Sequence, residues 1–122
     1  MGAARDTVNR LYAITLEHPD VASIRPLIDP DITFAGPLQR TEGADAYLEL
    51  NRQLLPLHVA TRMHSQFERG DEVCSIYEMD LRTPSGEVLD VPMADWIRVR
   101  DGRVAAQVLY YDPRPFGQAF GL

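Results

Sequence analysis

Hydrophobic residues recur at two different spacings along the chain. Up to residue 55 the apolar positions fall three or four residues apart, which is typical of helices that bury one face. This spacing predicts a helix over residues 6–17, a short helix after Asp20, and a third helix over residues 44–55. Pro19 and Pro56 follow the first and third helices and cannot continue their hydrogen-bond ladders.

The second half of the chain carries the spacing of β-strands instead. Strands are predicted, after a short one at residues 32–34, over residues 59–68, 72–82, 88–100 and 104–111. Asp101-Gly102 has the composition of a tight turn between the last two strands. Helices followed by a run of antiparallel strands predict an α+β fold in a single domain of residues 1–122.

The last predicted strand is apolar on both faces. Val108 and Tyr110 lie on one face, and Leu109 and Tyr111 on the other. A sheet with helices on one side normally presents polar residues on its other side. The sequence therefore predicts that something covers the second face. A second copy in a homodimer is the leading interpretation, and the segment 115–122 folding back is the alternative.

Composition narrows the classes of partner. A formal net charge of −6 over 122 residues argues against nucleic acid and against an anionic membrane surface. One cysteine excludes an internal disulfide, and neither a glycine-rich phosphate loop nor a metal-ligand cluster is present, so no cofactor or metal is expected. The first 20 residues lack the apolar stretch of a secretory signal, and we expect a cytoplasmic protein.

Asp95 is the most informative polar residue. Strand alternation places it on an apolar face, together with Val91, Met93, Ile97 and Val99. Burial raises the pKa of an acid unless a cation or several donors compensate. A carboxylic acid kept neutral at pH 7 can donate a hydrogen bond to a developing oxyanion. The alternative is a carboxylate that backbone donors satisfy, or one at a wet rim.

Two segments resemble the SnoaL-like proteins of the nuclear-transport-factor-2-like superfamily. The segment ADWIRVRDGRVAAQVLYYDP is similar to the terminal hairpin of that family, and DPDITFAGPL to its passage from the second helix into the first strand. The resemblance implies a cone in which three N-terminal helices pack on a curved, mostly antiparallel mixed sheet and enclose a pocket. The family includes ketosteroid isomerases, polyketide cyclases, limonene-epoxide hydrolases and non-catalytic modules, so it does not decide the reaction.

The ketosteroid isomerase pattern is met only in part. The resemblance places Asp95 at the oxyanion-hole acid, Tyr12 at its partner tyrosine and Tyr111 at a pocket aromatic. Without the resemblance, Tyr12 is better interpreted as a core residue. The proton-shuttling acid of that family precedes the proline of the first strand, where this chain has Gly36. Glycine cannot move a proton, so another residue must serve as the base.

Asp80 is the first candidate for that base, although two lines of reasoning disagree about it. Along residues 73–81 the odd positions are the more apolar set, which directs Glu78 and Asp80 to solvent. The resemblance instead turns Asp80 into the cavity beside Asp95, where two carboxylates would push each other's pKa values apart. Epoxide hydrolysis is not expected, because Glu78 and Leu109 stand where that chemistry needs an arginine and a second acid.

The residues expected to bind a small apolar molecule are Tyr111, Met93, Leu109, Phe34 and His64. His64 is a candidate pocket base, with an exposed position as the alternative. The leading hypothesis is an isomerase- or cyclase-type enzyme that acts on an apolar carbonyl compound, with Asp95, Tyr12 and Asp80 as its catalytic residues. The rivals are a non-catalytic ligand-binding module of the same fold and a dimerisation domain whose own side chains fill the cavity.

Overall fold

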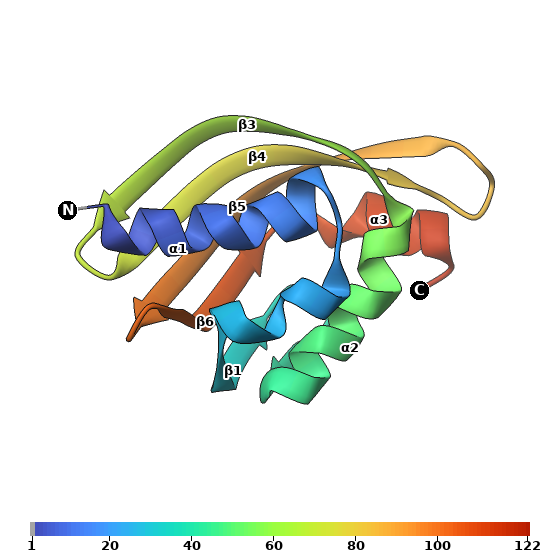
Figure 1. Cartoon of the computed structure of the whole chain (residues 1–122). Coiled ribbons are helices and arrows are strands. Elements are labelled where there is room, and N and C mark those ends of the chain that lie inside the picture. Colours follow the sequence, from blue (N-terminus) through green and yellow to red (C-terminus); the bar gives the residue numbers. More distant parts are fainter. Residues whose placement is uncertain (1) are drawn as a thin grey trace.

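A curved sheet with helices on its concave face makes up the structure, a computed structural model that describes residues 2–122 (Figure 1). The strand order is β2-β1-β6-β5-β4-β3. The strands are β1 (Ile28–Ala35), β2 (Arg40–Glu42), β3 (His58–Arg69), β4 (Glu72–Arg82), β5 (Val88–Arg100) and β6 (Arg103–Tyr110). β1 is parallel to β6 and every other pair is antiparallel, so the sheet is mixed and has two free edges.

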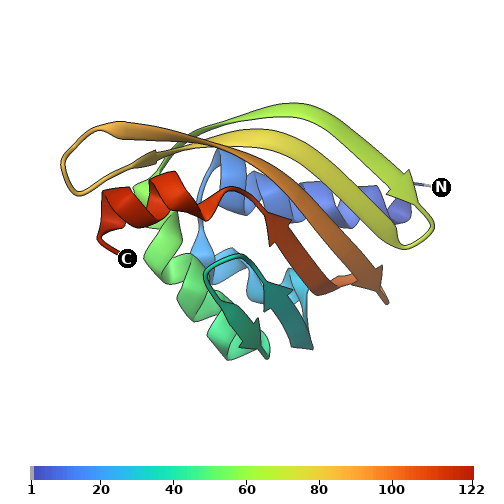
Figure 2. The same cartoon turned by 180° about the vertical axis from the view of Figure 1, so that it is seen from behind.

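Three α-helices lie against this sheet. α1 (Ala3–Tyr12) continues into a π-helical turn (Ala13–Glu17) and packs on β4, β5 and β6. α2 (Ala44–Leu54) packs on β1 and β2, and α3 (Pro113–Phe120) contacts β5. Both the front view and the view from behind show α1 beneath the arch of β3 and β4 (Figure 1 and Figure 2).

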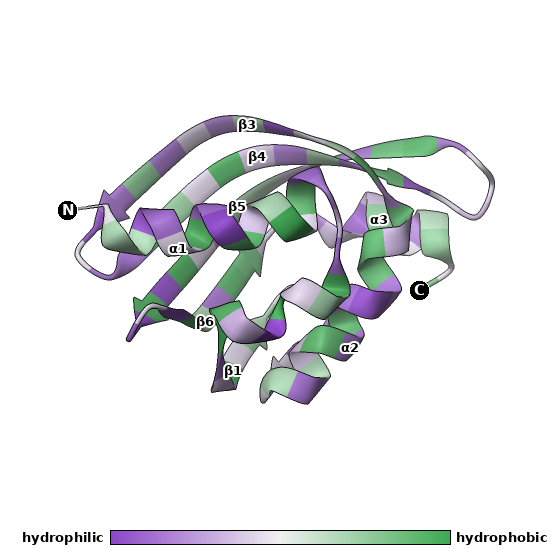
Figure 3. Cartoon of the chain, viewed as in Figure 1, coloured by the Kyte–Doolittle hydropathy of each residue, from purple (hydrophilic) through white to green (hydrophobic). Residues whose placement is uncertain are grey.

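The core lies between the concave face and the helices. In β4 the odd-numbered residues from Val73 to Leu81 are buried, while most even-numbered ones are half-buried. In β5 the buried residues are Val91, Met93, Asp95, Ile97 and Val99, the set that strand alternation predicted. Figure 3 shows apolar and polar residues alternating along the strands, and residues of both kinds along α1. The two-residue period therefore decides which side chains reach the cavity.

The structure confirms the α+β architecture and all four long strands, but the predicted second helix is absent. Two 3-10 turns, Val21–Ser23 and Arg25–Leu27, take its place. Pro26 lacks a backbone donor and disfavours a helical conformation at the residue before it, which explains why no α-helix propagates. Two α-helices, not three, therefore precede the long strands.

The C-terminal helix α3 was not predicted, although its signals are present. Asp112 caps it by accepting a hydrogen bond from the Arg114 backbone N–H at 3.0 Å, and Gly121 ends it with a positive φ of 71°. Phe116 and Phe120 of α3 face the helical side of the sheet, where they line a cavity. The segment 115–122 therefore does not cover the outer face, and that alternative is wrong.

The Asp101-Gly102 turn offers a test of how the last hairpin is held. Both residues have positive φ, 52° and 73°, as a primed turn requires. A side chain at Gly102 would meet no atom within 4 Å, so a substitution acts through the backbone alone. We expect Gly102→Ala to lower the free energy of unfolding by about 1 kcal/mol in urea denaturation.

Gly117→Ala is the matched control, because Gly117 lies within α3 and has no positive φ. Its new methyl group would lie 3.8 Å from the Leu122 carbonyl oxygen, an ordinary contact. This variant should be neutral or gain up to about 1 kcal/mol. Equal losses in the two variants would contradict the backbone explanation.

Candidate functional site

A cavity of about 520 Å³ lies between the concave face of the sheet and the helices. Most of its wall is apolar and includes Leu11, Leu16, Leu54, Met79, Met93 and Leu109. Leu38 and Leu122, which are exposed, lie at its open end. The cavity is not filled by the protein's own side chains, so the hypothesis of a collapsed dimerisation domain is wrong.

A group of hydrogen-bonded polar side chains lies in the buried wall of this cavity. Asp95, in the middle of β5, is 0% exposed. Its Oδ2 accepts hydrogen bonds from the hydroxyl groups of Tyr12, at 2.9 Å, and Tyr77, at 3.1 Å. The amide nitrogen of Gln107 donates to Oδ1 at 2.9 Å and to Oδ2 at 3.0 Å. Three separate elements, α1, β4 and β6, thus supply the donors that satisfy one carboxylate.

A fourth element, α2, contacts this polar group through Tyr47. The hydroxyl of Tyr47 donates to the side-chain oxygen of Gln107 at 2.6 Å. Asn51, one turn further along the helix, donates to the Tyr47 carbonyl oxygen. The Tyr47 ring packs edge-on against Phe34 with a centroid distance of 6.2 Å, and Tyr12 packs edge-on against Tyr77 at 5.9 Å. These contacts hold the tyrosine rings in position, and the position of each ring determines where its hydroxyl oxygen lies.

Burial dominates the electrostatics of the site. Loss of hydration raises the pKa of Asp95 from its ordinary 3.8 to about 6, against the lowering effect of the hydrogen bonds from Gln107, Tyr12 and Tyr77. Burial and the nearby charge of Asp95 raise the pKa values of Tyr12 and Tyr77, so both phenols stay protonated. No Lys, Arg or His side chain lines the cavity, and Asp95 is its one acidic side chain among residues 2–122.

Six of the residues predicted for the site line the cavity: Asp95, Tyr12, Tyr111, Met93, Leu109 and Phe34. Gly36 lines it as well, so the position that holds the shuttling acid in ketosteroid isomerases, according to the resemblance, faces the same space but carries no functional group. The structure therefore brings the two residues of the predicted oxyanion-binding pair together, and no second acidic side chain of residues 2–122 lines the cavity.

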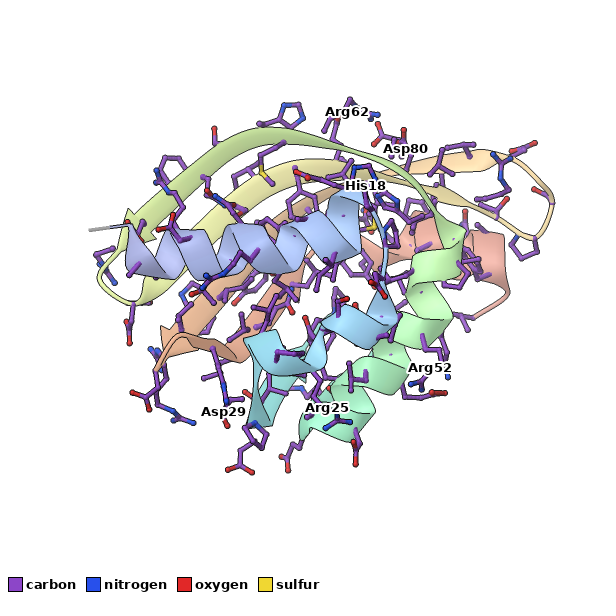
Figure 4. All side chains as sticks on the ribbon, in the orientation of Figure 1. His18, Arg25, Asp29, Arg52, Arg62 and Asp80 are labelled. Carbon is purple, nitrogen blue, oxygen red and sulfur yellow. The ribbon has the colours of Figure 1, made fainter. Side chains whose placement is uncertain are left out.

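Asp80 does not line the cavity, and its predicted place beside Asp95 is wrong. It lies on the outer side of the sheet, where the Arg62 guanidinium donates to both of its oxygens, at 2.7 and 3.2 Å (Figure 4). These hydrogen bonds hold the pKa of Asp80 below its usual value. Strand alternation had directed Asp80 outward, and the residue follows that pattern.

His64 is also outside the cavity. Its side chain is half-exposed and lies 3.3 Å from Glu78 on the outer side. The β3–β4 register shifts between Met63 and Ser65, so His64 stands at an irregularity of the strand. The exposed position, the alternative given by the sequence, is the one observed.

Sequence reasoning missed Tyr77, Gln107 and Tyr47 as members of the site. Tyr77 belongs to the buried odd positions of β4, and Gln107 is a polar residue between Ala105 and Leu109 on the inner face of an apolar strand. A polar residue on such a face is the signal that drew attention to Asp95. The same signal could have found Gln107.

None of the helices within residues 2–122 is long and apolar enough to span a membrane. Nor do these residues bring three His, Cys, Asp or Glu side chains together in a way that could hold a metal ion.

The mixed curved sheet, its helices and the cavity with a buried acid define a pocket protein of the nuclear-transport-factor-2-like superfamily. Within it, the SnoaL-like domain matches residues 8–107, and the chain belongs to this family. A search of curated proteins found no match.

Solved structures agree on the fold. A putative SnoaL-like polyketide cyclase from Jannaschia sp. CCS1 superposes with a TM-score of 0.83 at 19% identity, covering 97% of this chain and 91% of that one. TerC, co-crystallised with polyporic acid, gives 0.82 at 15% identity, with coverage of 98% and 99%. A protein with a ketosteroid isomerase-like fold from Catenulispora acidiphila, in complex with trimethylamine, gives 0.76 at 16%, with coverage of 94% and 92%. Identities this low show a shared fold alone.

The raised pKa of Asp95 makes a testable contribution to stability. The folded protein binds this proton more tightly than the unfolded chain, so the stabilising effect is fully present below pH 4 and is lost as the pH rises through 6. We expect the unfolding free energy of the wild type, relative to that of Asp95→Asn, to fall by on the order of 3 kcal/mol between pH 4 and pH 6.5. Urea denaturation at each pH measures the difference.

The same substitution at Asp80 is the control. Because the pKa of Asp80 is lowered, the pH dependence of the unfolding free energy has the opposite sign. The wild type gains stability over Asp80→Asn as the pH rises, and this gain is nearly complete once the pH exceeds the ordinary pKa of the carboxyl group, near pH 4. Parallel curves for the two variants would show that Asp95 is not the group that titrates with a raised pKa.

Proposed function

We propose that this chain is an acid–base enzyme of the isomerase or cyclase type that acts on an apolar carbonyl compound. The observation that carries the proposal is a single acid, Asp95, buried in the wall of an apolar cavity with its pKa raised to about 6. A general base works best when its pKa lies near the operating pH. A putative polyketide cyclase has the same fold.

In this proposal Asp95 takes the role of the base. The ionised carboxylate accepts a proton from the carbon next to the substrate carbonyl, and the electron pair left behind moves onto the carbonyl oxygen. The neutral Asp95 then returns the proton to another atom of the same substrate. The single acid of the cavity thus ends the cycle in the state in which it began.

The phenol groups supply the stabilisation of the oxyanion. While Asp95 is ionised, Tyr12 and Tyr77 both direct their protons to it. Once Asp95 is protonated, its neutral carboxyl group is a weaker acceptor than the carboxylate, so one phenol can turn its proton from Oδ2 toward the substrate. The donor becomes available at the step in which negative charge develops, which is when such a donor accelerates a reaction.

A non-catalytic ligand-binding module of the same fold is the second candidate. Gly36 favours it, because the position that faces the cavity there carries no acid. The full set of donors around Asp95 favours it too, since a carboxylate satisfied by Tyr12, Tyr77 and Gln107 could serve structure alone.

Turnover of steroid enones and of polyketide-like β-ketones, followed by product analysis, separates the two candidates. We expect Asp95→Asn to lower kcat by at least about 10²-fold on any compound that the wild type converts, because the variant cannot move a proton. Asp80→Asn makes the same chemical change on the outer side and should leave kcat unchanged. Binding of these compounds with no conversion by the wild type would establish the binding module instead.

We also propose that the outer face of the sheet pairs with a second copy of the chain. Ile76, Trp96, Val108 and Tyr110 lie on this face, and Tyr110 is 60% exposed. The helices α1, α2 and α3 all lie on the opposite side. Burial of these side chains against a copy of themselves would remove apolar surface from water.

Sedimentation equilibrium tests this pairing. We expect a mass of twice 13.7 kDa for the wild type, and a shift toward the single mass for Val108→Arg, which places a charge on the apolar face. A wild type that sediments at the single mass at every concentration would contradict the proposal.

A further inference from the structure

Gln107 is buried between the acid of the site and a tyrosine of α2. It is 8% exposed, and both ends of its amide are engaged. The nitrogen bridges the two oxygens of Asp95 at 2.9 and 3.0 Å, and the oxygen accepts from the Tyr47 hydroxyl at 2.6 Å. No other side chain of the described residues contacts both oxygens of Asp95 with hydrogen bonds.

The two oxygens of Asp95 are unequally occupied. Oδ2 accepts from Tyr12 and Tyr77 as well as from Gln107, which uses all of its lone-pair capacity. Oδ1 accepts from Gln107 alone. One lone pair of Oδ1 therefore remains for a proton, and Gln107 is the group that determines which way that oxygen points.

The direction of the amide has a physical cause. The hydroxyl of Tyr47 donates its proton to Gln107 and therefore needs an acceptor there. The amide oxygen consequently faces Tyr47, and the amide nitrogen faces Asp95. The reverse orientation would set the amide oxygen against an ionised carboxylate, with no proton between them. Tyr47 thereby selects the orientation in which Gln107 donates.

We propose that Gln107 is a positioning residue, which Tyr47 orients and which holds the Asp95 carboxylate so that Oδ1 alone is open to accept the proton. The proposal deepens the function proposed above and rests on it for its kinetic part only. Gln107 touches the carboxyl group and not the reacting atoms, so it acts through Asp95. The hydroxyl of Tyr47, on α2, acts one step further away.

No other group around Asp95 could take over this task. The titratable groups that face it are Tyr12 from α1, Tyr77 from β4 and Tyr47 from α2, and burial raises the pKa of each. All three stay neutral over the range in which Asp95 titrates, and no Lys, Arg or His side chain of the described part of the chain lines the cavity. Among the hydrogen bonds that favour the ionised carboxylate, those from Gln107 contribute most.

The test follows the titration of Asp95 in the ligand-free protein by carbon-13 NMR of its carboxyl group. We expect Gln107→Met, which keeps the length of the side chain and removes the amide, to raise the midpoint by about 1 pH unit or more. Tyr47→Phe should raise the midpoint by less, because the amide remains but is no longer oriented. The double variant should titrate like Gln107→Met, because Tyr47 acts through Gln107.

Gln66→Met is the matched control. Gln66 lies outside the cavity lining, where its amide nitrogen donates to Asn9 and Ser75. Its loss should leave the Asp95 midpoint in place. An unchanged Asp95 midpoint in Gln107→Met, or an equal shift in Gln66→Met, overturns the proposal. If Gln107→Met does not fold, Tyr47→Phe takes its place, and an unchanged Asp95 midpoint in that variant overturns the proposal.

Kinetics distinguish a failure of this inference from a failure of the proposed function. On a compound that the wild type converts, Gln107→Met should lower kcat about 10-fold or more with little change in KM, and the acidic limb of the pH–rate profile should move up with the NMR midpoint. If the acidic limb of the pH–rate profile stays in place while the NMR midpoint moves, Asp95 is not the catalytic base. The positioning of Asp95 by Gln107 is then correct and the proposed reaction is wrong.

Discussion

Asp95 is a carboxyl group buried without a cation, and the arrangement around it depends on how that burial is compensated. Burial of an unpaired charge costs several kcal/mol, whereas a hydrogen bond to a charged group contributes about 1.5–3 kcal/mol. The donors come from α1, β4 and β6, and α2 reaches them through Tyr47. Hydrogen bonds around one carboxyl group therefore link α1, α2, β4 and β6 to β5. A shift of any of them would leave a buried donor or acceptor unsatisfied.

The compensation is incomplete, and this determines the pKa of Asp95. Three donating side chains lower the pKa of Asp95, yet burial still raises it to about 6. An arginine in the cavity wall would have kept the acid ionised, as Arg62 does for Asp80 on the outer side. Phenols and an amide supply hydrogen bonds without charge, so the proton can both leave and return near neutral pH. The protonation of Asp95 and the direction of the phenol protons are therefore coupled.

The sequence predicted the fold more completely than the site. Alternation along β4 and β5 predicted the buried face of each strand, and the Asp101-Gly102 turn predicted the hairpin of β5 and β6. The prediction of a second helix was wrong, because Pro26 prevents an α-helix despite the helical spacing of the apolar residues around it. Asp95 and Tyr12 were found, but Gln107 was not, although it is a polar residue on the apolar inner face of β6. Its contact with Tyr47 of α2, in contrast, is encoded by no local pattern.

Asp80 shows why a resemblance cannot replace the position of a residue along its strand. Asp80 and Asp95 lie on the neighbouring strands β4 and β5, and the resemblance placed them together, yet their side chains leave the sheet on opposite sides. One residue type consequently has a lowered pKa in one position and a raised pKa in the other.

With Gly36 at the remaining candidate position, Asp95 has no like charge beside it, and its pKa depends on burial and neutral donors alone. Two acids can divide the giving and taking of protons between them. In the function that we propose, a single acid must do both, so the reaction is one in which the proton removed from a substrate is returned to it.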